Sequence, residues 1–153
     1  MTSMTTTLAE LDFFVDLDTD VLAAIAGCGH PTHIPEAAYL FQQGEPADAF
    51  YAVRQGRVAI EVHDPRFGRI VIDTVEAGDV VGWSWLVPPY RWLFDARAVT
   101  AIDEVQFDAQ CLRQKCDVDP TFGYALLQRV IHVMHERLQA SRVRLLDLYG
   151  VPQ

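Results

Sequence analysis

The residues of this sequence that could perform catalysis do not occur in the spacings that enzymes use. The chain contains no Gly-x-Ser-x-Gly nucleophile turn, no His-Glu-x-x-His metal motif and no Walker-type glycine-rich loop. Ser84, in Gly-Trp-Ser-Trp-Leu, has no neighbouring base in the sequence, and we interpret it as the cap of a short helix. Asp79 follows Gly78 and is typical of a turn. The sequence therefore favours a protein that is not an enzyme.

Two groups of metal-ligating side chains are present, and neither has the pattern of a complete site. Cys28, His30 and His33 lie close together, but a transition-metal site needs three or four ligands with supporting hydrogen bonds. We place this segment at a helix end and in a loop, and we expect a structural role for it. His132 and His135 stand at i, i+3, and we expect them in solvent or at an interface. The sequence therefore predicts no metal centre.

The cysteine content argues against a disulfide framework. The chain has three cysteines, an odd number, which favours free thiols in a reducing cytoplasm. Cys111 and Cys116 lie in and just after a short helix expected at residues 108–116, and we interpret both as small buried hydrophobic residues. The resulting expectation is a cytoplasmic protein.

An aromatic segment occupies residues 82–92 and reads Gly-Trp-Ser-Trp-Leu-Val-Pro-Pro-Tyr-Arg-Trp. It contains all three tryptophans of the chain. Large aromatic side chains are costly to leave in water, so they are expected to bind a ligand, face a partner or fill a core. Composition alone leaves these three roles open.

Length and charge exclude several classes of partner. The chain has 153 residues, and its formal net charge is −9; this length suits one domain with a sizeable core. An acidic surface disfavours nucleic-acid backbones and anionic membranes. The N-terminus has neither a cationic region nor an apolar run, so we expect no signal peptide. No apolar stretch reaches the ~18 residues of a membrane span. We therefore expect neither a nucleic acid nor a membrane as partner.

The hydrophobic pattern shows which elements must position these side chains. Residues 1–7 form a polar leader, and residues 8–148 form the domain, which begins with two short helices. Short apolar runs separated by Gly, Pro and Asp across about residues 30–108 predict six or more strands. In one strand the apolar residues that alternate with polar neighbours are Val58, Ile60 and Val62. The pattern predicts a mainly β fold with flanking helices, a double-stranded β-helix or jelly-roll barrel.

C-terminal helices are expected across residues 108–148. The longer one is predicted to begin at Asp119-Pro120, with the aspartate as cap, and to run to about Leu148. Its heptad seam, broken only at Ser141, consists of Leu127, Ile131, Met134, Leu138, Leu145 and Leu148. A second apolar strip beside the seam consists of Leu126, Val130 and Val133. We expect one strip to pack on the barrel and the other to pair with a second copy in a homodimer. The alternative is one broad stripe buried within a monomer.

Residues 40–62 carry a Gly-Glu pair, an aspartate and two aromatics before a Val-x-x-Gly-x-Val pattern. The residues of this motif are Gly44, Glu45, Asp48, Phe50, Tyr51, Val53, Gly56 and Val58. In order and spacing the motif resembles the early barrel strands of the cyclic nucleotide-binding domain family, which includes the catabolite activator protein and the regulatory subunits of protein kinase A. Residues 76–82 are similar to the start of that family's phosphate-binding cassette, and residues 96–108 are similar to the two strands that follow it. The likeness covers roughly residues 8–146.

The resemblance implies a ligand site in the cassette. In the family a glutamate accepts a hydrogen bond from the ribose 2′-hydroxyl, and an arginine and backbone N–H groups hold the cyclic phosphate. With Gly82 and Ala98 in register, Trp83 replaces that glutamate and Trp92 replaces that arginine. Arg91, one residue away, either lines the pocket or lies on the surface against an aromatic ring. Because both polar anchors are replaced, we do not expect ordinary binding of cyclic AMP or cyclic GMP.

Two functions follow from the resemblance. The first is a non-catalytic regulatory sensor of a small ligand, either a cyclic nucleotide or a flatter, more apolar molecule. Its candidate ligand-binding residues are Gly82, Trp83, Ser84, Trp85, Arg91 and Trp92. The second is a ligand-free protein-interaction or assembly module, in which the aromatic segment is core or partner surface. Tryptophans that face an open, polar-lined cavity favour the sensor, and a filled barrel favours the interaction module.

Overall fold

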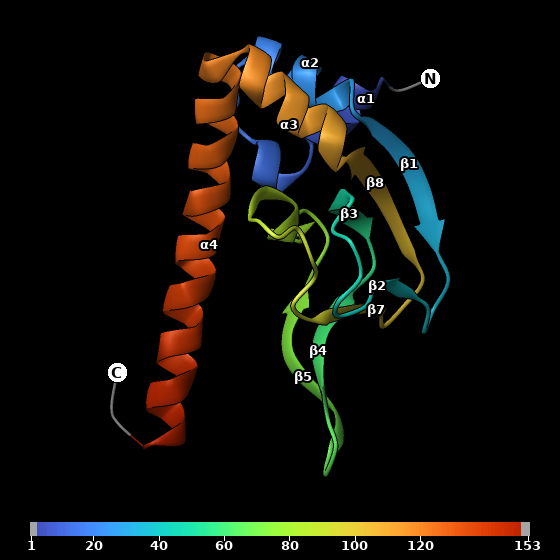
Figure 1. Cartoon of the computed structure of the whole chain (residues 1–153), viewed down its shortest axis with the longest axis vertical. Coiled ribbons are helices and arrows are strands. Elements are labelled where there is room, and N and C mark those ends of the chain that lie inside the picture. The colour runs from blue at the N-terminus through green and yellow to red at the C-terminus, as the bar shows by residue number, and fades with distance from the viewer. Residues whose placement is uncertain (1–2, 151–153) are drawn as a thin grey trace.

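The computed structural model describes residues 3–150, and its strands form two antiparallel sheets flanked by helices (Figure 1). The sheet orders are β1-β8-β3-β6 and β2-β7-β4-β5. The strands are β1 (Gly29–Ile34), β2 (Tyr39–Phe41), β3 (Ala49–Gln55), β4 (Val58–Asp64), β5 (Gly68–Val75), β6 (Val80–Val81), β7 (Asp95–Ala98) and β8 (Ile102–Asp108). The helices are α1 (Met4–Ala9), α2 (Thr19–Ala26), α3 (Ala109–Val118) and α4 (Pro120–Leu148), with 3₁₀ turns η1 (Asp12–Phe14) and η2 (Ser84–Leu86). The predicted fold class is confirmed.

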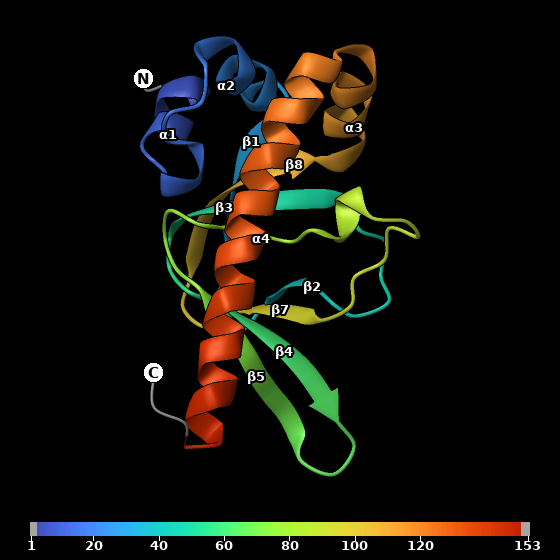
Figure 2. The ribbon, with the colours of Figure 1, turned by 90° about the vertical axis from the view of Figure 1, so that its left-hand side faces the viewer.

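The short helices cover one end of the strands. Figures 1 and 2 show α1, α2 and α3 gathered there, the β4–β5 hairpin extending from the opposite end, and α4 running alongside. Phenylalanines fill the junction: Phe13 lies 5.7 Å from Phe50, and Phe14 lies 6.0 Å from Phe107, between ring centroids. The helical end and the β1-β8-β3-β6 sheet therefore share one core.

The long helix α4 has the bounds that the sequence predicts. The Asp119 carboxylate accepts hydrogen bonds from the backbone N–H groups of Thr121 and Phe122, and Pro120 occupies the first turn. These contacts satisfy donors that a helix start leaves unpaired. Within the described part of the chain, no helix is both long enough and apolar enough to cross a bilayer.

The two apolar strips of α4 have different surroundings. Leu126, Val130 and Val133 are buried, and each residue is at most 9% exposed. The seam residues are 42–82% exposed, and they are Leu127, Ile131, Met134, Leu138, Leu145 and Leu148. The alternative of one broad stripe buried within a monomer is therefore wrong, because the chain covers only the second strip.

Arginines of α3 and α4 join the helices to the rest of the chain through backbone carbonyl groups. Their guanidinium groups donate across distances of 2.6–2.8 Å, from Arg113 to Trp85, from Arg129 to Phe13 and Val15, and from Arg137 to Val80. Hydrogen bonds from a charged donor are stronger than neutral ones. They fix α3 and α4 against η1, β6 and η2.

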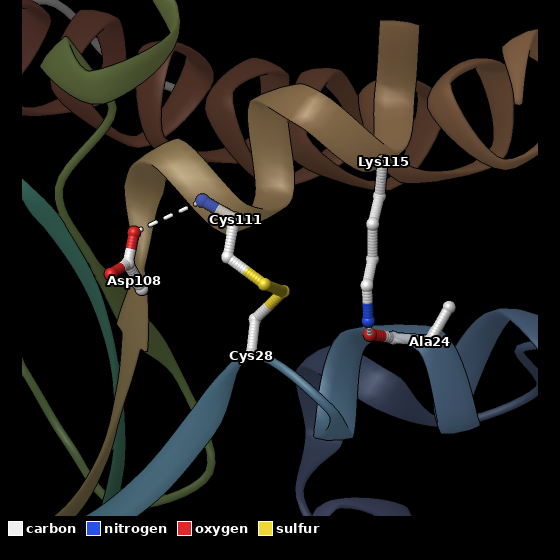
Figure 3. The surroundings of a disulfide bond; sticks show 5 residues. All are labelled: Ala24, Cys28, Asp108, Cys111 and Lys115. Carbon is white, nitrogen blue, oxygen red and sulfur yellow. Dashed lines mark hydrogen bonds between the residues drawn. A yellow bond between two sulfur atoms is a disulfide. The ribbon is translucent and has the colours of Figure 1, made fainter. Parts of the chain in front are cut away.

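A disulfide joins Cys28 to Cys111 across 83 residues, so the interpretation of the cysteines as free thiols is wrong for this pair (Figure 3). Cys28 directly precedes β1, and Cys111 lies in the first turn of α3, where its backbone N–H donates to the capping carboxylate of Asp108. Because β1 pairs with β8 and β8 leads into α3, the sheet brings the two sulfurs together. Cys111 is also half-buried rather than buried. Cys116 is free and half-buried.

Two local expectations about the strands are also wrong. His30 and His33 lie on β1 rather than in a loop, and β1 pairs along its whole length with β8. In β4 the register shifts between Ile60 and Glu61, which buries Glu61 to 1% exposure while Val62 stays partly exposed. A bulge of this kind reverses the faces that strict alternation assigns.

Candidate functional site

The three tryptophans of segment 82–92 lie in different environments. Trp85 and Trp92 are 0% and 4% exposed, whereas Trp83 is only partly buried. The segment is therefore not a single aromatic patch, and each ring has its own partners.

Trp92 lies inside the barrel against Phe41. The two rings are stacked, with 3.7 Å between centroids and 9° between planes. Gly82 lies beside the indole, with φ at +98°, and a Cβ added there would come within 2.6 Å of the Trp92 ring. Glycine tolerates this backbone conformation and leaves room for the close approach. The absence of a side chain at residue 82 therefore lets the indole fill this space.

The backbone around Trp92 is held as well as its ring. Its N–H donates to the carbonyl of Glu45 at 3.0 Å, and its carbonyl accepts from the N–H of Gly44 at 2.8 Å. Two carboxylates brace the same turn, because Glu45 accepts from Gln42 N–H and Asp95 accepts from Gln43 N–H. Each of these carboxylates therefore stabilises the loop that faces Trp92.

Trp85 belongs to the core between the barrel and the helices. Its indole N–H donates to the carbonyl of Gly82 at 3.1 Å, and its ring lies 5.3 Å from that of Phe50. A buried indole N–H with a partner avoids the cost of an unpaired donor. Trp85 therefore has a packing role in this structure.

Trp83 connects the segment to α4. The guanidinium carbon of Arg137 lies 5.1 Å from the centre of the Trp83 ring, a cation–π distance. Arg137 also forms an ion pair with Asp79 at 3.0 Å. Residue 83, where the family's glutamate is expected, thus contacts the long helix.

Neither Arg91 nor Ser84 lines either of the two cavities described below. Arg91 is exposed, and its guanidinium donates to the carbonyl of Gly44 at 3.2 Å. The interpretation of Ser84 as a helix cap is wrong, because Ser84 is the first residue of η2 and the cap position belongs to Trp83, without a side-chain bond. The structure therefore brings together Gly82, Trp85 and Trp92 and leaves Arg91 apart.

A buried acid on β8 was not found by sequence reasoning. Glu104 is 0% exposed; one carboxylate oxygen accepts from the Thr32 hydroxyl at 3.0 Å, and the other has no partner among the described residues. Burial raises the pKa of Glu104 to about 7, although the bond from Thr32 opposes this shift. Burial and then the charge of Glu104 also raise the pKa of Tyr51. The one feature of the sequence that could have indicated this buried acid is the position of Glu104 in a predicted strand, where a core-facing residue is expected.

The second sheet contains a buried ion pair. Arg97 of β7 donates to both carboxylate oxygens of Glu61 of β4, at 2.9 and 3.2 Å, and Arg69 lies 3.4 Å from the same group. This bidentate pairing offsets the cost of burying the Glu61 charge. It strengthens the pairing of β4 with β7, which is the strand that follows the aromatic segment along the chain.

Two cavities lie away from segment 82–92. One, of about 500 Å³, is bounded by α2, α3 and the start of α4 and is lined in part by Cys111 and Lys115. The other, of about 590 Å³, lies between η1, the turn before β6 and α4. Among the described residues, no group of three or more histidine, cysteine or acidic side chains is placed to hold a metal ion.

A family model and several curated proteins are similar to this chain. Residues 31–119 match the family model described as "Cyclic nucleotide-binding domain". The chain is 25% identical over 141 residues to a CRP-like cAMP-activated global transcriptional regulator of Mycobacterium tuberculosis, covering 92% of this chain and 61% of the relative. It is 27% identical over 116 residues to the cAMP-activated global transcriptional regulator CRP of Salmonella typhimurium, covering 73% and 52%.

A solved structure shows the same fold. The crystal structure of a cyclic nucleotide-binding domain from Methylobacillus flagellatus superposes with a TM-score of 0.79 at 19% identity, covering 95% of this chain and 82% of that one. The chain spans about three fifths or less of the length of the two curated relatives above.

Proposed function

Because the chain belongs to the cyclic nucleotide-binding domain family, we propose that it is a regulatory, non-catalytic module whose nucleotide seat is occupied by its own Trp92 side chain. In this proposal the module does not respond to cyclic AMP or cyclic GMP at ordinary signalling concentrations. It acts by assembling with other protein chains.

The stacking of Trp92 on Phe41 is the observation that carries the proposal. The indole stands where the family's arginine is expected to hold a phosphate, and it is 4% exposed. A nucleotide would have to displace a ring held by Phe41 and Gly82. It would also have to bind without either polar anchor, and loss of one partner of a buried charge pair costs on the order of 2–5 kcal/mol.

The assembly surface that we propose is the exposed seam of α4, in a homodimer. Its apolar side chains recur at heptad spacing and lie in solvent in the single chain. A heptad seam of this kind is buried when two helices pair. A further protein partner fits the exposed apolar side chains in and directly after the aromatic segment, which are Val87, Leu93 and Phe94.

A second candidate function, sensing of a small ligand other than cyclic AMP or cyclic GMP, is favoured by one set of contacts. Arg113 of α3 donates to the carbonyl of Trp85 at 2.8 Å, and its guanidinium lies 4.6 Å from the centre of the Tyr90 ring. A flat ligand that displaced Trp92 would shift the segment that α3 contacts. Its site would comprise Gly82, Trp83, Ser84, Trp85, Arg91 and Trp92.

The cellular setting forms part of the proposal. We propose a cytoplasmic protein, and we propose that these 153 residues do not contact nucleic acid directly, because their net charge is −9. The relatives in Mycobacterium and Salmonella are named as transcriptional regulators. This chain corresponds to only part of each of them, so the proposal is confined to the domain itself.

Titration with cyclic AMP and cyclic GMP, followed by calorimetry and by tryptophan fluorescence, tests the proposal. We expect no saturable signal up to about 1 mM of either nucleotide. Saturable binding in the low micromolar range, together with a change in tryptophan emission, would instead establish a nucleotide sensor.

A further inference from the structure

The Cys28–Cys111 disulfide holds α3 against the N-terminal helices (Figure 3). Cys28 follows the end of α2, and Cys111 lies in the first turn of α3. One turn beyond Cys111, the Lys115 ammonium donates to the carbonyl of Ala24 in α2 at 2.6 Å. A covalent bond and a charged hydrogen bond therefore fasten α3 at neighbouring points.

Only one of the two sulfurs belongs to a residue that a small thiol can reach. Cys28 is 6% exposed, whereas Cys111 is half-buried and lines the cavity of about 500 Å³ between α2, α3 and α4. Val118, on the wall of the same cavity, is 86% exposed, so the cavity opens to solvent. An incoming thiol would therefore approach Cys111.

The charges around the cavity favour exchange with a particular class of thiol. Lys115, whose ammonium bonds to the carbonyl of Ala24 four residues before Cys28, supplies a positive charge on the side of the departing Cys28 thiolate. Asp18 and Asp20 also line the cavity and repel anionic thiols. An uncharged dithiol therefore suits this site better than an anionic monothiol.

The third cysteine is poorly suited to attack the bond. Burial, and then the charge of Asp117, raise the pKa of the Cys116 thiol. A thiol with a raised pKa is mostly protonated near neutral pH and is a weak nucleophile. We therefore consider a thiol supplied from outside the chain.

We propose that Cys28–Cys111 is a reversible thiol–disulfide exchange site that controls the attachment of α3. A thiolate of a dithiol attacks the Cys111 sulfur, forms a mixed disulfide and releases Cys28 as a thiolate, which takes up a proton from water. The second thiol of the same reductant then closes the reductant's own disulfide and frees Cys111 as a thiol. Two electrons pass from the dithiol to the protein, and the oxidised dithiol reverses the exchange.

Opening or closing the disulfide affects the aromatic segment through the contacts that α3 makes with it. Two residues after Cys111, Arg113 bonds to the carbonyl of Trp85 and covers the Tyr90 ring. With the disulfide closed, α3 holds segment 82–92 against the core. When the disulfide is open, the Lys115–Ala24 hydrogen bond remains, but the covalent link from α3 to Cys28 is lost, and the segment loosens.

Hydrogen exchange of the whole chain tests this proposal. The protein is compared in oxidised form, after native reduction with dithiothreitol, and after reoxidation with oxidised dithiothreitol, with thiol trapping to count free cysteines. We expect full reduction without denaturant and at least about tenfold faster amide exchange in residues 82–92 and 109–118. The β4–β5 hairpin should be unaffected, and reoxidation should restore protection. Glutathione at equal thiol concentration should react more slowly.

Variants separate this site from a purely structural bond. Cys111→Ser should reproduce the fast exchange of the reduced form in residues 82–92, and the matched change Cys116→Ser should leave exchange and native reduction as in the parent. The proposal is overturned if the disulfide reduces only when the chain unfolds. It is also overturned if the reduced, folded protein protects residues 82–92 as well as the oxidised protein does.

Discussion

The indole of Trp92 lies flat on the phenyl ring of Phe41, with 3.7 Å between the ring centroids. The pair occupies the part of the barrel where the family's phosphate arginine is expected. Core packing and the proposed loss of nucleotide binding therefore depend on the same side chain. Substitutions at residue 92 should accordingly change both stability and ligand binding.

Replacement of Trp92 by alanine should destabilise the chain by about 3–5 kcal/mol, because it removes a large buried side chain and leaves a cavity. Urea unfolding measures this change in the free energy of unfolding. Trp83→Ala is the matched comparison and should cost clearly less, since Trp83 is only partly buried. Equal losses at the two positions would contradict the filled barrel.

Restoring both anchors should create cyclic nucleotide binding. The double change Trp83→Glu with Trp92→Arg empties the space beside Phe41 and supplies the ribose acceptor and the phosphate donor. We expect cyclic AMP to bind this variant at least about tenfold more tightly than the parent, as measured by calorimetry. The control, Trp83→Gln with Trp92→Met, opens similar space without the charges and should gain less. If both variants bind equally, space rather than charge limits binding.

A charge in the α4 seam should dissociate the proposed homodimer. Leu138→Glu places a carboxylate in the middle of the apolar seam, opposite its own copy, whereas Gln139→Glu adds the same charge one residue away. Sedimentation velocity should show a monomer for the first variant and a dimer for the second. A dimer that survives Leu138→Glu would place the interface elsewhere.

The buried Glu104 should make stability depend on pH. Burial raises its pKa in the folded state to about 7 from an ordinary 4.5, so the folded chain binds this proton more tightly than the unfolded chain. The contribution is fully present below about pH 4.5 and is lost as pH rises through 7, by about 3 kcal/mol in total. Urea unfolding at pH 4.5 and pH 8 measures it.

Glu104→Gln should remove most of this slope and should be the more stable protein at pH 8. The control is Glu36→Gln, which changes an exposed carboxylate and should leave the slope unaltered. An unchanged slope in Glu104→Gln would mean that the acid reaches water in the folded chain.

Much of the fold could be predicted because its signals are local. The cap at Asp119, the proline after it and the heptad spacing fix α4, and alternating apolar residues mark the strands. The placement of Trp83 and Trp92 at the family's glutamate and arginine positions comes from register alone and stays a prediction. None of these inferences requires knowledge of which distant segments meet.

The remaining features depend on contacts between distant segments. The Cys28–Cys111 bond requires β1 to pair with β8, and the burial of Glu61 requires a one-residue shift in β4 that alternation cannot indicate. The stacking of Trp92 requires Gly82 and Phe41 to meet across the barrel. The sequence named the candidate residues of segment 82–92, but the burial of Trp85 and Trp92 and the exposure of Arg91 depend on these distant contacts.

The arginine bonds of α3 and α4 have a consequence for how this chain can change over time. Arg113, Arg129 and Arg137 bond to backbone carbonyls, which every residue possesses, so substitutions at the accepting positions cannot delete these acceptors. The residues that supply the accepting carbonyls can therefore be substituted while the hydrogen bonds to α3 and α4 persist. The three arginines cannot be substituted in the same way. Lysine lacks the forked geometry of a guanidinium donor, and shorter side chains do not reach the carbonyls.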